Sequence, residues 1–217
     1  MPKVSEEYIA NKRREIVDAA HRICLRKPVS MVTMTDLIDE TGMAQGGIYR
    51  YFEDIDGVFK AMLVDMRESY SIIEDVDRIF DNADDTPPAD IVDQICDLLA
   101  DRMEEQLMDI QKINFDLSVL AINDPARTAK ILGGITGEGN LEHLTRRTTE
   151  LMMKASAEGR FNPSVPPEDI MKFISSAYSG IQMNCIISAC YSKSPMGGYE
   201  PRALFRTLAR TIRLLIE

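Results

Sequence analysis

Apolar side chains recur at helical spacing along most of the chain, and this periodicity constrains the fold more than any other feature. In the first segment, the residues that share one helix face at i, i+3, i+4, i+7 and i+8 are Ile16, Ala19, Ala20, Ile23 and Cys24. Nowhere do apolar and polar residues alternate as they do in a half-buried strand. The sequence therefore predicts an all-α protein of about nine helices.

Proline, glycine and acidic clusters divide the helical pattern into segments. Pro28 ends the first helix because its ring cannot continue the hydrogen-bond ladder, and Gly42 suits the left-handed position that closes a helix. The acidic stretch 81–88, which contains two prolines, predicts a loop. Further helices are expected over 34–41, 44–52, 54–80, 90–122 in one or two pieces, 141–157, 168–191 and 202–217.

The formal net charge of −10 by itself argues against a nucleic-acid partner. The charge is unevenly distributed, however. Residues 1–27 hold seven basic and four acidic side chains, whereas residues 61–217 hold 16 basic and 25 acidic ones. DNA binding requires a local basic surface, which the overall charge does not measure, so a DNA-binding N-terminal region stays possible.

Catalytic and metal-binding patterns are absent from the sequence. Cys24, Cys96, Cys185 and Cys190 lack Cys-x-x-Cys spacing and only two histidines occur, so we expect reduced, packed thiols, no metal and no cofactor. His143, near a helix start, is expected at the surface. No nucleophile–base pair or phosphate loop indicates an enzyme. No apolar run reaches the roughly 18 residues of a membrane span, so we expect a cytoplasmic protein without a membrane partner.

Residues 33–52 contain the pattern that most directly indicates a function. Thr33 and Asp36 resemble a capping box before a short helix, and Gly42 leads into a second short helix. Two short helices around such a turn form a helix-turn-helix, whose second helix enters the major groove of DNA. The side chains expected to bury the contact between these helices are Leu37, Met43, Ile48 and Phe52. Those left to face DNA are Gln45, Gly46, Gly47, Tyr49 and Arg50.

A family resemblance lies in the run Gly42-x-x-x-Gly46-x-Ile48-Tyr49-Arg50-Tyr51-Phe52. The run is similar to the signature of the TetR family of transcriptional regulators, and Thr33 and Asp36 precede it at the family's spacing. With the opening helix, the resemblance covers about residues 10–63. It implies a homodimer on a palindromic double-stranded DNA operator, released when a small-molecule effector binds the second domain.

The resemblance also implies roles for single residues. Gln45 matches a base-reading position, Tyr49 a phosphate-contacting tyrosine, and Thr35 a contact at the start of the preceding helix. Tyr51 lies near the DNA backbone. The full set expected at DNA is Thr33, Thr35, Gln45, Gly46, Gly47, Tyr49, Arg50 and Tyr51. Gly47 and Ile55 stand where the family often has a hydroxyl residue and a lysine, which removes two phosphate contacts.

Several basic side chains have a local alternative to DNA contact. Arg50 could instead pair with Glu53 or Asp54. The basic run of residues 12–14 could contact phosphate or could simply be a solvated helix start.

Methionine and aromatic residues of the second part are candidates for an effector pocket. They are Met103, Phe115, Met152, Tyr178 and Met183. Methionine adapts to flexible apolar ligands, but it also fills gaps in an ordinary core, and the sequence leaves both alternatives open. The helix over 168–191 is apolar on nearly every side, and Ser176, Ala177 and Gly180 would let a partner helix approach. We therefore expect this helix and the last one to form the dimer interface.

The sequence thus predicts two parts, a DNA-binding domain over 1–53 and an effector-binding and dimerisation domain over 54–217. The expected function is that of a ligand-responsive repressor. The alternative is a helical small-molecule-binding or scaffold protein whose helix-turn-helix does not bind DNA.

Overall fold

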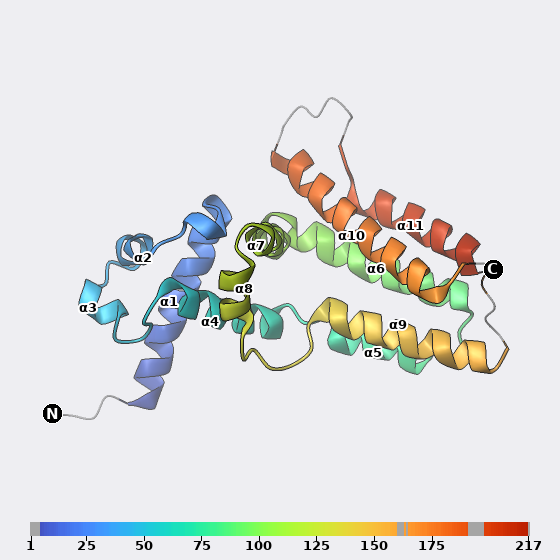
Figure 1. The fold of residues 1–217 in the computed structure, drawn as a ribbon, viewed down its shortest axis with the longest axis horizontal. Helices are drawn as coiled ribbons and strands as arrows, with labels where there is room; N and C mark the ends of the chain where they lie inside the picture. Colours follow the sequence, from blue (N-terminus) through green and yellow to red (C-terminus); the bar gives the residue numbers. More distant parts are fainter. Residues whose placement is uncertain (1–4, 160–162, 164, 191–197, 217) are drawn as a thin grey trace. The chain divides into compact units, whose positions relative to one another are not determined.

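The computed structural model describes residues 5–159, 163, 165–190 and 198–216, and within these ranges the predicted all-α fold is confirmed, with no strand. Its helices are α1 (Glu6–Arg26), α2 (Met34–Thr41), α3 (Gln45–Ile48), α4 (Ile55–Ser69), α5 (Ile73–Asp81), α6 (Pro88–Gln106), α7 (Lys112–Asn123), α8 (Pro125–Leu132), α9 (Asn140–Ala157), α10 (Pro167–Cys190) and α11 (Pro201–Ile216) (Figure 1). A 3-10 turn, η1 (Val29–Met31), follows α1, and a π-helical segment, η2 (Leu107–Gln111), joins α6 to α7.

The described helices outnumber the about nine expected because the chain breaks more often than its apolar pattern indicates. The segment 54–80 divides into α4 and α5, and the N–H of Ile72 at the break donates to Asn140 Oδ1 at 3.1 Å. An additional short helix, α8, begins at Pro125, where the Asp124 carboxylate accepts from the N–H of Arg127 at 3.0 Å. Long-range and capping contacts of this kind leave no trace in helical periodicity.

The segment expected as a helix over 44–52 is shorter in the structure. α3 ends at Ile48, and the N–H of Tyr51 then donates to the carbonyl of Ile48 at 2.9 Å in a tighter turn. Two consecutive glycines, Gly46 and Gly47, disfavour a longer helix here.

The chain packs as two compact units that interleave along the sequence. Unit 1 comprises Met1–Tyr70 and Lys112–Gly137, and unit 2 comprises Ser71–Gln111 and Glu138–Glu217. These packing units differ from a division after residue 53, because α4 packs against α1 and α8, and α7 packs against α1 and η1. The functional division into 1–53 and 54–217 stays a prediction.

Unit 1 is organised around the apolar face of α1. All five residues of the predicted stripe are buried, from Ile16 to Cys24. α2 and α4 lie against α1 (Figure 1), and they contribute the fully buried side chains Leu37, Val58 and Phe59. The apolar periodicity of the first helix is therefore the basis of the unit 1 core.

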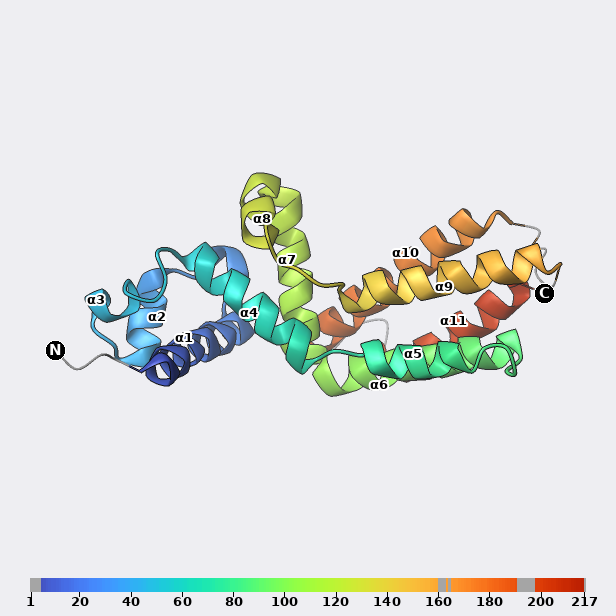
Figure 2. The same ribbon diagram turned by 90° about the horizontal axis from the view of Figure 1, so that it is seen from below.

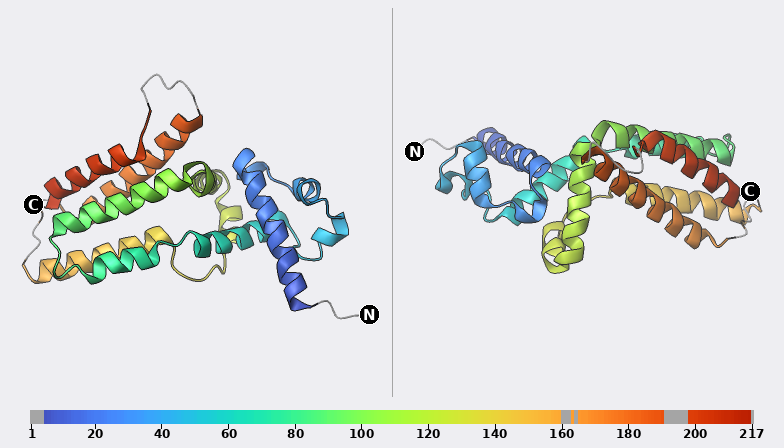
Figure 3. Two further views of the ribbon diagram at one scale, coloured as in Figure 1. Left: turned by 180° about the vertical axis from the view of Figure 1, so that it is seen from behind. Right: turned by 90° about the horizontal axis from the view of Figure 1, so that it is seen from above.

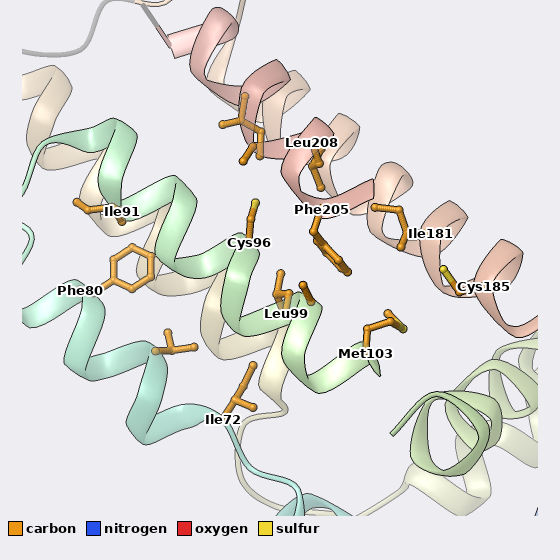
Figure 4. Close-up of a cluster of buried hydrophobic side chains, with 14 of the residues drawn as sticks. Ile72, Phe80, Ile91, Cys96, Leu99, Met103, Ile181, Cys185, Phe205 and Leu208 are labelled. Atoms are coloured by element: carbon orange, nitrogen blue, oxygen red, sulfur yellow. The ribbon is translucent and has the colours of Figure 1, made fainter. Parts of the chain in front are cut away.

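Unit 2 is a bundle in which α11 packs along α6 and α10, while α5 packs along α6 and α9 (Figures 2 and 3). Its buried cluster joins Phe80 of α5, Leu99 and Met103 of α6, Ile181 of α10 and Phe205 of α11 (Figure 4). Side chains of α5, α6, α10 and α11 thus meet in one core.

The cysteines follow the sequence expectation in three of four positions. Cys24, Cys96 and Cys185 are buried, whereas Cys190 is exposed, so the expectation that all four are packed is wrong at the C-terminal end of α10. Burial raises the pKa of the Cys24 and Cys96 thiols to about 12 and that of Cys185 to about 11. These three thiols stay protonated and unreactive near neutral pH.

Helices of unit 2 are amphipathic or interrupted by polar residues. In the part of the chain that the structure describes, none combines the length and apolar content needed to cross a bilayer.

Thr33 and Asp36 form the predicted capping box of α2, and this contact is testable. The Thr33 hydroxyl accepts from the N–H of Asp36 at 3.3 Å, and the Asp36 carboxylate accepts from the N–H of Thr33 at 2.8 Å. Thr33→Ala should lower the free energy of unfolding by about 1 kcal/mol, because an orphan N–H loses its partner. Urea denaturation measures this, with the exposed Thr35→Ala as the matched control on the same helix. Equal stabilities of the two variants would contradict the capping role.

Candidate nucleic-acid interface and ligand cavity

The helix-turn-helix consists of α2, a turn closed by Gly42, and α3. Gly42 has φ 65°, in the left-handed region that glycine adopts without strain, and its N–H donates to the carbonyl of Ile38 at 2.9 Å. The predicted inward face is largely confirmed. Leu37, Ile48 and Phe52 are buried, while Met43 is only half-buried.

The outward face of α3 carries the residues expected to read DNA. Gln45 is the first residue of the helix, and Gln45, Tyr49 and Arg50 are all exposed. A Cβ added at Gly46 would meet nothing within 4 Å, so packing inside the protein does not require glycine there. The small size of Gly46 thus leaves room for an external surface to approach the α3 backbone.

The other expected DNA-facing residues have more varied surroundings. Thr35 is exposed near the start of α2, whereas the Thr33 hydroxyl is engaged in the capping box and donates to Asp36 Oδ2 at 2.7 Å. Gly47 is half-buried, and an added Cβ would lie 3.6 Å from the Met43 side chain. Tyr51 is half-buried as well.

Arg13 joins α1 to the end of α3. Its guanidinium donates to the carbonyl oxygen of Tyr51 at 2.6 Å and lies 4.2 Å from the centre of the Phe52 ring. Both contacts hold the segment that follows α3 against α1. Arg13 therefore has a structural role that the sequence did not reveal. Its neighbour Lys12 pairs with Glu15 at 2.6 Å, while Arg14 is exposed.

Further cations of α1 hold α2 in place. The Lys27 amine lies 2.7 Å from Asp36 Oδ2, and the Arg22 and Arg26 side chains both pair with Glu40. The hydrogen bond from Lys27 holds the pKa of the Asp36 carboxyl below its ordinary value. Much of the basic surplus of residues 1–27 is thus engaged inside unit 1.

The start of α4 is an acidic cap bound by cations of α8. The Asp54 carboxylate accepts from the N–H of Gly57 at 2.8 Å and pairs with Lys130 at 2.7 Å. Asp54 therefore has a partner other than Arg50, and no ion pair joins Arg50 to Glu53 among the residues described. Ile55, the first residue of α4, is half-buried.

Unit 2 contains a cavity of about 620 Å³ between α6, α9, α10 and α11. Its walls are mainly aliphatic and include Ile91, Ile95, Leu144, Leu151, Ile174 and Ile212. A sealed void of this size would cost on the order of 15 kcal/mol at about 24 cal/mol per Å³, which matches the whole stability of an ordinary domain. The cavity instead reaches the surface at exposed lining residues such as Ser175 and Ser176, where solvent or a ligand fills it.

Only two of the five predicted effector residues line this cavity. Met152 and Tyr178 do so. Met103 is fully buried in the unit 2 core, and Met183 is 39% exposed on α10, outside the cavity wall. Phe115 belongs to α7 in unit 1 and is not among the residues that line this cavity. For Met103 the alternative of a core methionine fits the structure better.

Tyr178 connects the cavity wall to the end of η2. Its hydroxyl donates to Gln111 Oε1 at 3.4 Å, and Gln182 donates to the same oxygen at 2.8 Å. Burial raises the pKa of Tyr178 to about 12, so the phenol keeps its proton near neutral pH. Gln182 thus forms a hydrogen bond with the side chain of Gln111. Asn184 donates to the carbonyl of Gly180 at 2.8 Å within its own helix.

His143 is buried in an ionic cluster, which contradicts the expectation that it lies at the surface. Its Nδ1 lies 2.7 Å from Glu138 Oε2, and its Nε2 lies 2.9 Å from Asp77 Oδ1 of α5. Arg146 completes the cluster at Glu138 Oε1, at 2.8 Å. His143 is buried because α5 packs over α9, and this long-range contact is not revealed by the local sequence.

Comparisons with known proteins agree with this helix-turn-helix. The family model described as "Bacterial regulatory proteins, tetR family" matches residues 16–62. An uncharacterised HTH-type transcriptional regulator, YfiR of Bacillus subtilis, is 23% identical over 185 residues, which is 85% of each chain. The HTH-type transcriptional repressor Rv1474c of Mycobacterium tuberculosis is 39% identical over 62 residues, 29% of this chain and 33% of that protein.

Among solved structures, the fatty acid degradation regulator FadR of Bacillus halodurans has a similar fold. The TM-score is 0.61 at 15% identity, and the match covers 97% of this chain and 96% of that one. The matched residues 16–62 span the helix-turn-helix, and the fold of the chain is similar to that of solved transcriptional regulators. The match to the tetR family model agrees with the resemblance that the sequence shows over about residues 10–63.

The cluster around His143 predicts a pH dependence of stability. Hydrogen bonds from Arg146 and His143 lower the pKa of Glu138 to about 2 from the ordinary 4.5. Because the folded-state pKa is depressed, the contribution of Glu138 is fully present above about pH 4.5 and declines as the pH falls toward about 2. Glu138→Gln should destabilise the protein near neutral pH, and its difference from wild type should shrink over that window in urea titrations.

The matched control for this prediction is Glu142→Gln. Glu142 accepts from the N–H of Gly139 at the start of α9, and glutamine at this position still caps the helix. A Glu138→Gln deficit that stayed constant from pH 7 to pH 3 would rule out the ionised carboxylate as its cause.

Proposed function

We propose that the protein is a homodimeric repressor that binds a palindromic operator through α3 and is released by a small molecule in the unit 2 cavity. The observation that carries the DNA-binding part is that Gln45, at the start of α3, and Tyr49 and Arg50, in the turn that follows it, are exposed. Ile48 and Phe52 are buried and anchor this segment to the rest of unit 1. A major groove about 12 Å wide accepts one helix, and residues at its N-terminus reach the base edges.

Base reading and phosphate contact are assigned to different side chains. Gln45, the first residue of α3, has an amide that can pair with the edge of adenine. Tyr49 lies one turn later and supplies a phenol for the DNA backbone, and the exposed Arg50 adds a positive charge beside it. Phosphate contacts position a protein on DNA, whereas base contacts specify the sequence.

Dimerisation is supported by an exposed stripe on α10. Phe173, Met183 and Ile187 are 44%, 39% and 45% exposed. With Ser176 and Gly180 they follow a spacing of three and four residues, as in a helix–helix seam. A Cβ added at Gly180 would meet nothing within 4 Å. A second copy packed on this stripe would cover side chains that one chain leaves in solvent, as a twofold symmetric dimer requires.

A route from the cavity toward the DNA-binding unit follows the chain itself. Tyr178 lines the cavity and donates to Gln111, the last residue of η2. The next residue, Lys112, opens α7 and donates to the carbonyl of Cys24 in α1 at 2.9 Å. A ligand that displaces Tyr178 would remove one of two hydrogen bonds to Gln111. A coupling of roughly 1–3 kcal/mol between ligand and DNA would be ordinary for such a switch.

Substitutions at Gln45 and Tyr49 test the DNA-binding assignment. Gln45→Ala should relax the preference for one base pair in each half-site, while Tyr49→Phe should weaken binding to all sequences about equally. Fluorescence anisotropy with DNA from the region upstream of the gene measures both. Gln94→Ala, an exposed glutamine of α6, is the matched control and should leave binding unchanged.

Two outcomes would contradict the proposed DNA binding. Unchanged operator binding in both α3 variants would mean that α3 is not the recognition helix. No binding by the wild-type chain to any upstream sequence, at low salt, would favour a small-molecule-binding or scaffold protein. The two missing phosphate contacts at Gly47 and Ile55 make that rival worth testing.

The dimer is tested by placing a charge on the α10 stripe. Met183→Glu should convert the dimer into monomers at micromolar concentration, because a carboxylate buried in an apolar interface lacks a partner. Analytical ultracentrifugation measures this. Met153→Glu is the matched control, since Met153 is 69% exposed on α9 and lies outside the stripe. A wild-type monomer, or a Met183→Glu dimer of unchanged stability, would contradict the proposed interface.

A further inference from the structure

We propose that the unit 2 cavity holds the single long aliphatic chain of an amphiphile with one anionic head group, such as a long-chain carboxylate, and that the head lies beside Lys172. This inference rests on the proposed effector response and names the chemical class of the ligand. Three features of the cavity carry it, namely its lining, its dimensions and its charge.

The interior of the cavity offers almost no hydrogen-bond donors. The Thr145 and Thr148 hydroxyls donate to carbonyls one turn earlier in α9, at 2.7 and 2.8 Å. The Tyr178 hydroxyl donates to Gln111, and the rest of the interior wall is apolar, formed by aliphatic side chains together with Phe80, Cys96, Met152 and Met171. A ligand with several buried polar groups would leave them unpaired, at a cost of about 1–3 kcal/mol each in such a site. The buried part of the ligand must therefore be apolar.

The cavity is long compared with its width. Its lining runs along α6 from Pro88 to Leu99 and along α9 from Leu141 to Ala155. At about 1.5 Å per residue these walls span roughly 16 and 21 Å. A volume of about 620 Å³ spread over that length gives a mean cross-section of roughly 30–40 Å². An extended aliphatic chain fits this section, whereas a broad fused ring system would fill only part of the length.

One charged side chain borders the cavity. Lys172 is the only ionised residue among the described lining residues, and the hydroxyl-bearing Ser175 and Ser179 lie on the same exposed side of α10. Lys172 pairs with Asp169 at 2.9 Å, but both side chains are more than half exposed, so this pair is weak and exchangeable. An anionic head group at this border would pair with the Lys172 amine and still remain hydrated.

A chain-length series on the wild-type protein tests the aliphatic part. Isothermal titration calorimetry with straight-chain carboxylates of about 8 to 18 carbons should show affinity rising roughly threefold to fourfold per methylene, and then levelling off when the chain exceeds the cavity. Anthracene-9-carboxylate, a broad anionic ring system, should bind at least tenfold more weakly than the best chain. Absence of binding throughout the series, or a rise with no upper limit, would overturn the proposal.

The head group is tested with the alcohol and the amine of the best chain length. The carboxylate should bind more tightly than either, and Lys172→Gln should reduce this preference about threefold while leaving the affinity for the alcohol unchanged. Lys154→Gln is the matched control, because Lys154 lies on α9 outside the lining and pairs with Asp84. Equal affinities for all three head groups in wild type would overturn the assignment of Lys172.

The location is tested with neighbouring threonines of α9. Thr148 lines the cavity and Thr149 is exposed outside it. Thr148→Trp should reduce carboxylate affinity at least tenfold, and Thr149→Trp should leave it unchanged, with circular dichroism reporting the fold of both. The chain has no tryptophan of its own, so each variant also gives a single fluorophore. The fluorescence of the Thr148→Trp variant should respond to saturating carboxylate, and an equal response of the Thr149→Trp variant would overturn that location.

The outcomes distinguish this inference from the proposed function. Carboxylate binding without any effect on DNA binding would support the ligand class and contradict effector release. Wild-type DNA binding that is released only by ligands without an aliphatic chain would support a ligand-responsive repressor and overturn the ligand class.

Discussion

The position of α3 depends on the cations of α1. Arg13 holds the segment that follows α3 through the Tyr51 carbonyl and the Phe52 ring, and Lys27 holds the start of α2 through Asp36. α3 is too short to be stable alone and contains two glycines, so it keeps its orientation only through such tertiary contacts. The basic residues that give the N-terminal segment its positive balance therefore act first as a scaffold. Under the proposed function, DNA contact falls to a small number of exposed side chains.

The apolar side chains of unit 2 lie in three different surroundings. One part forms a packed core around Phe205, a second lines the cavity, and a third is the exposed stripe of α10. α10 takes part in all three, with Ile181 in the core, Ile174 at the cavity wall and Ile187 on the stripe. A helix that is apolar all round needs a separate cover for each side. Neighbouring helices, a ligand and a second copy would together supply these covers.

Local patterns predicted the elements of the fold but not their neighbours. The buried stripe of α1, the capping box at Thr33 and the left-handed Gly42 follow from spacing and residue type alone. Helical periodicity shows which face of a helix is apolar, but not what covers that face, so it does not reveal that Met183 lies outside the wall of the unit 2 cavity. His143 shows the same limit for a polar residue, because its carboxylate partner Asp77 lies 66 positions earlier. The cavity itself has no local signal, since its walls come from helices far apart in the sequence.

The interleaving of the two units has a consequence for biosynthesis. The helices α1 to α4 leave the ribosome first, but α7 and α8, which pack against α1 and α4, follow only after α5 and α6 of unit 2. Unit 1 cannot complete its core until residue 137 has been translated. The growing chain must therefore hold two incomplete cores at once. Unit 1 lacks α7 and α8 while α5 and α6 of unit 2 are already made, and unit 2 lacks α9 to α11 until unit 1 is complete. A truncated product that ends between α4 and α7 would expose apolar surface, and it would be a natural target for chaperones and proteases.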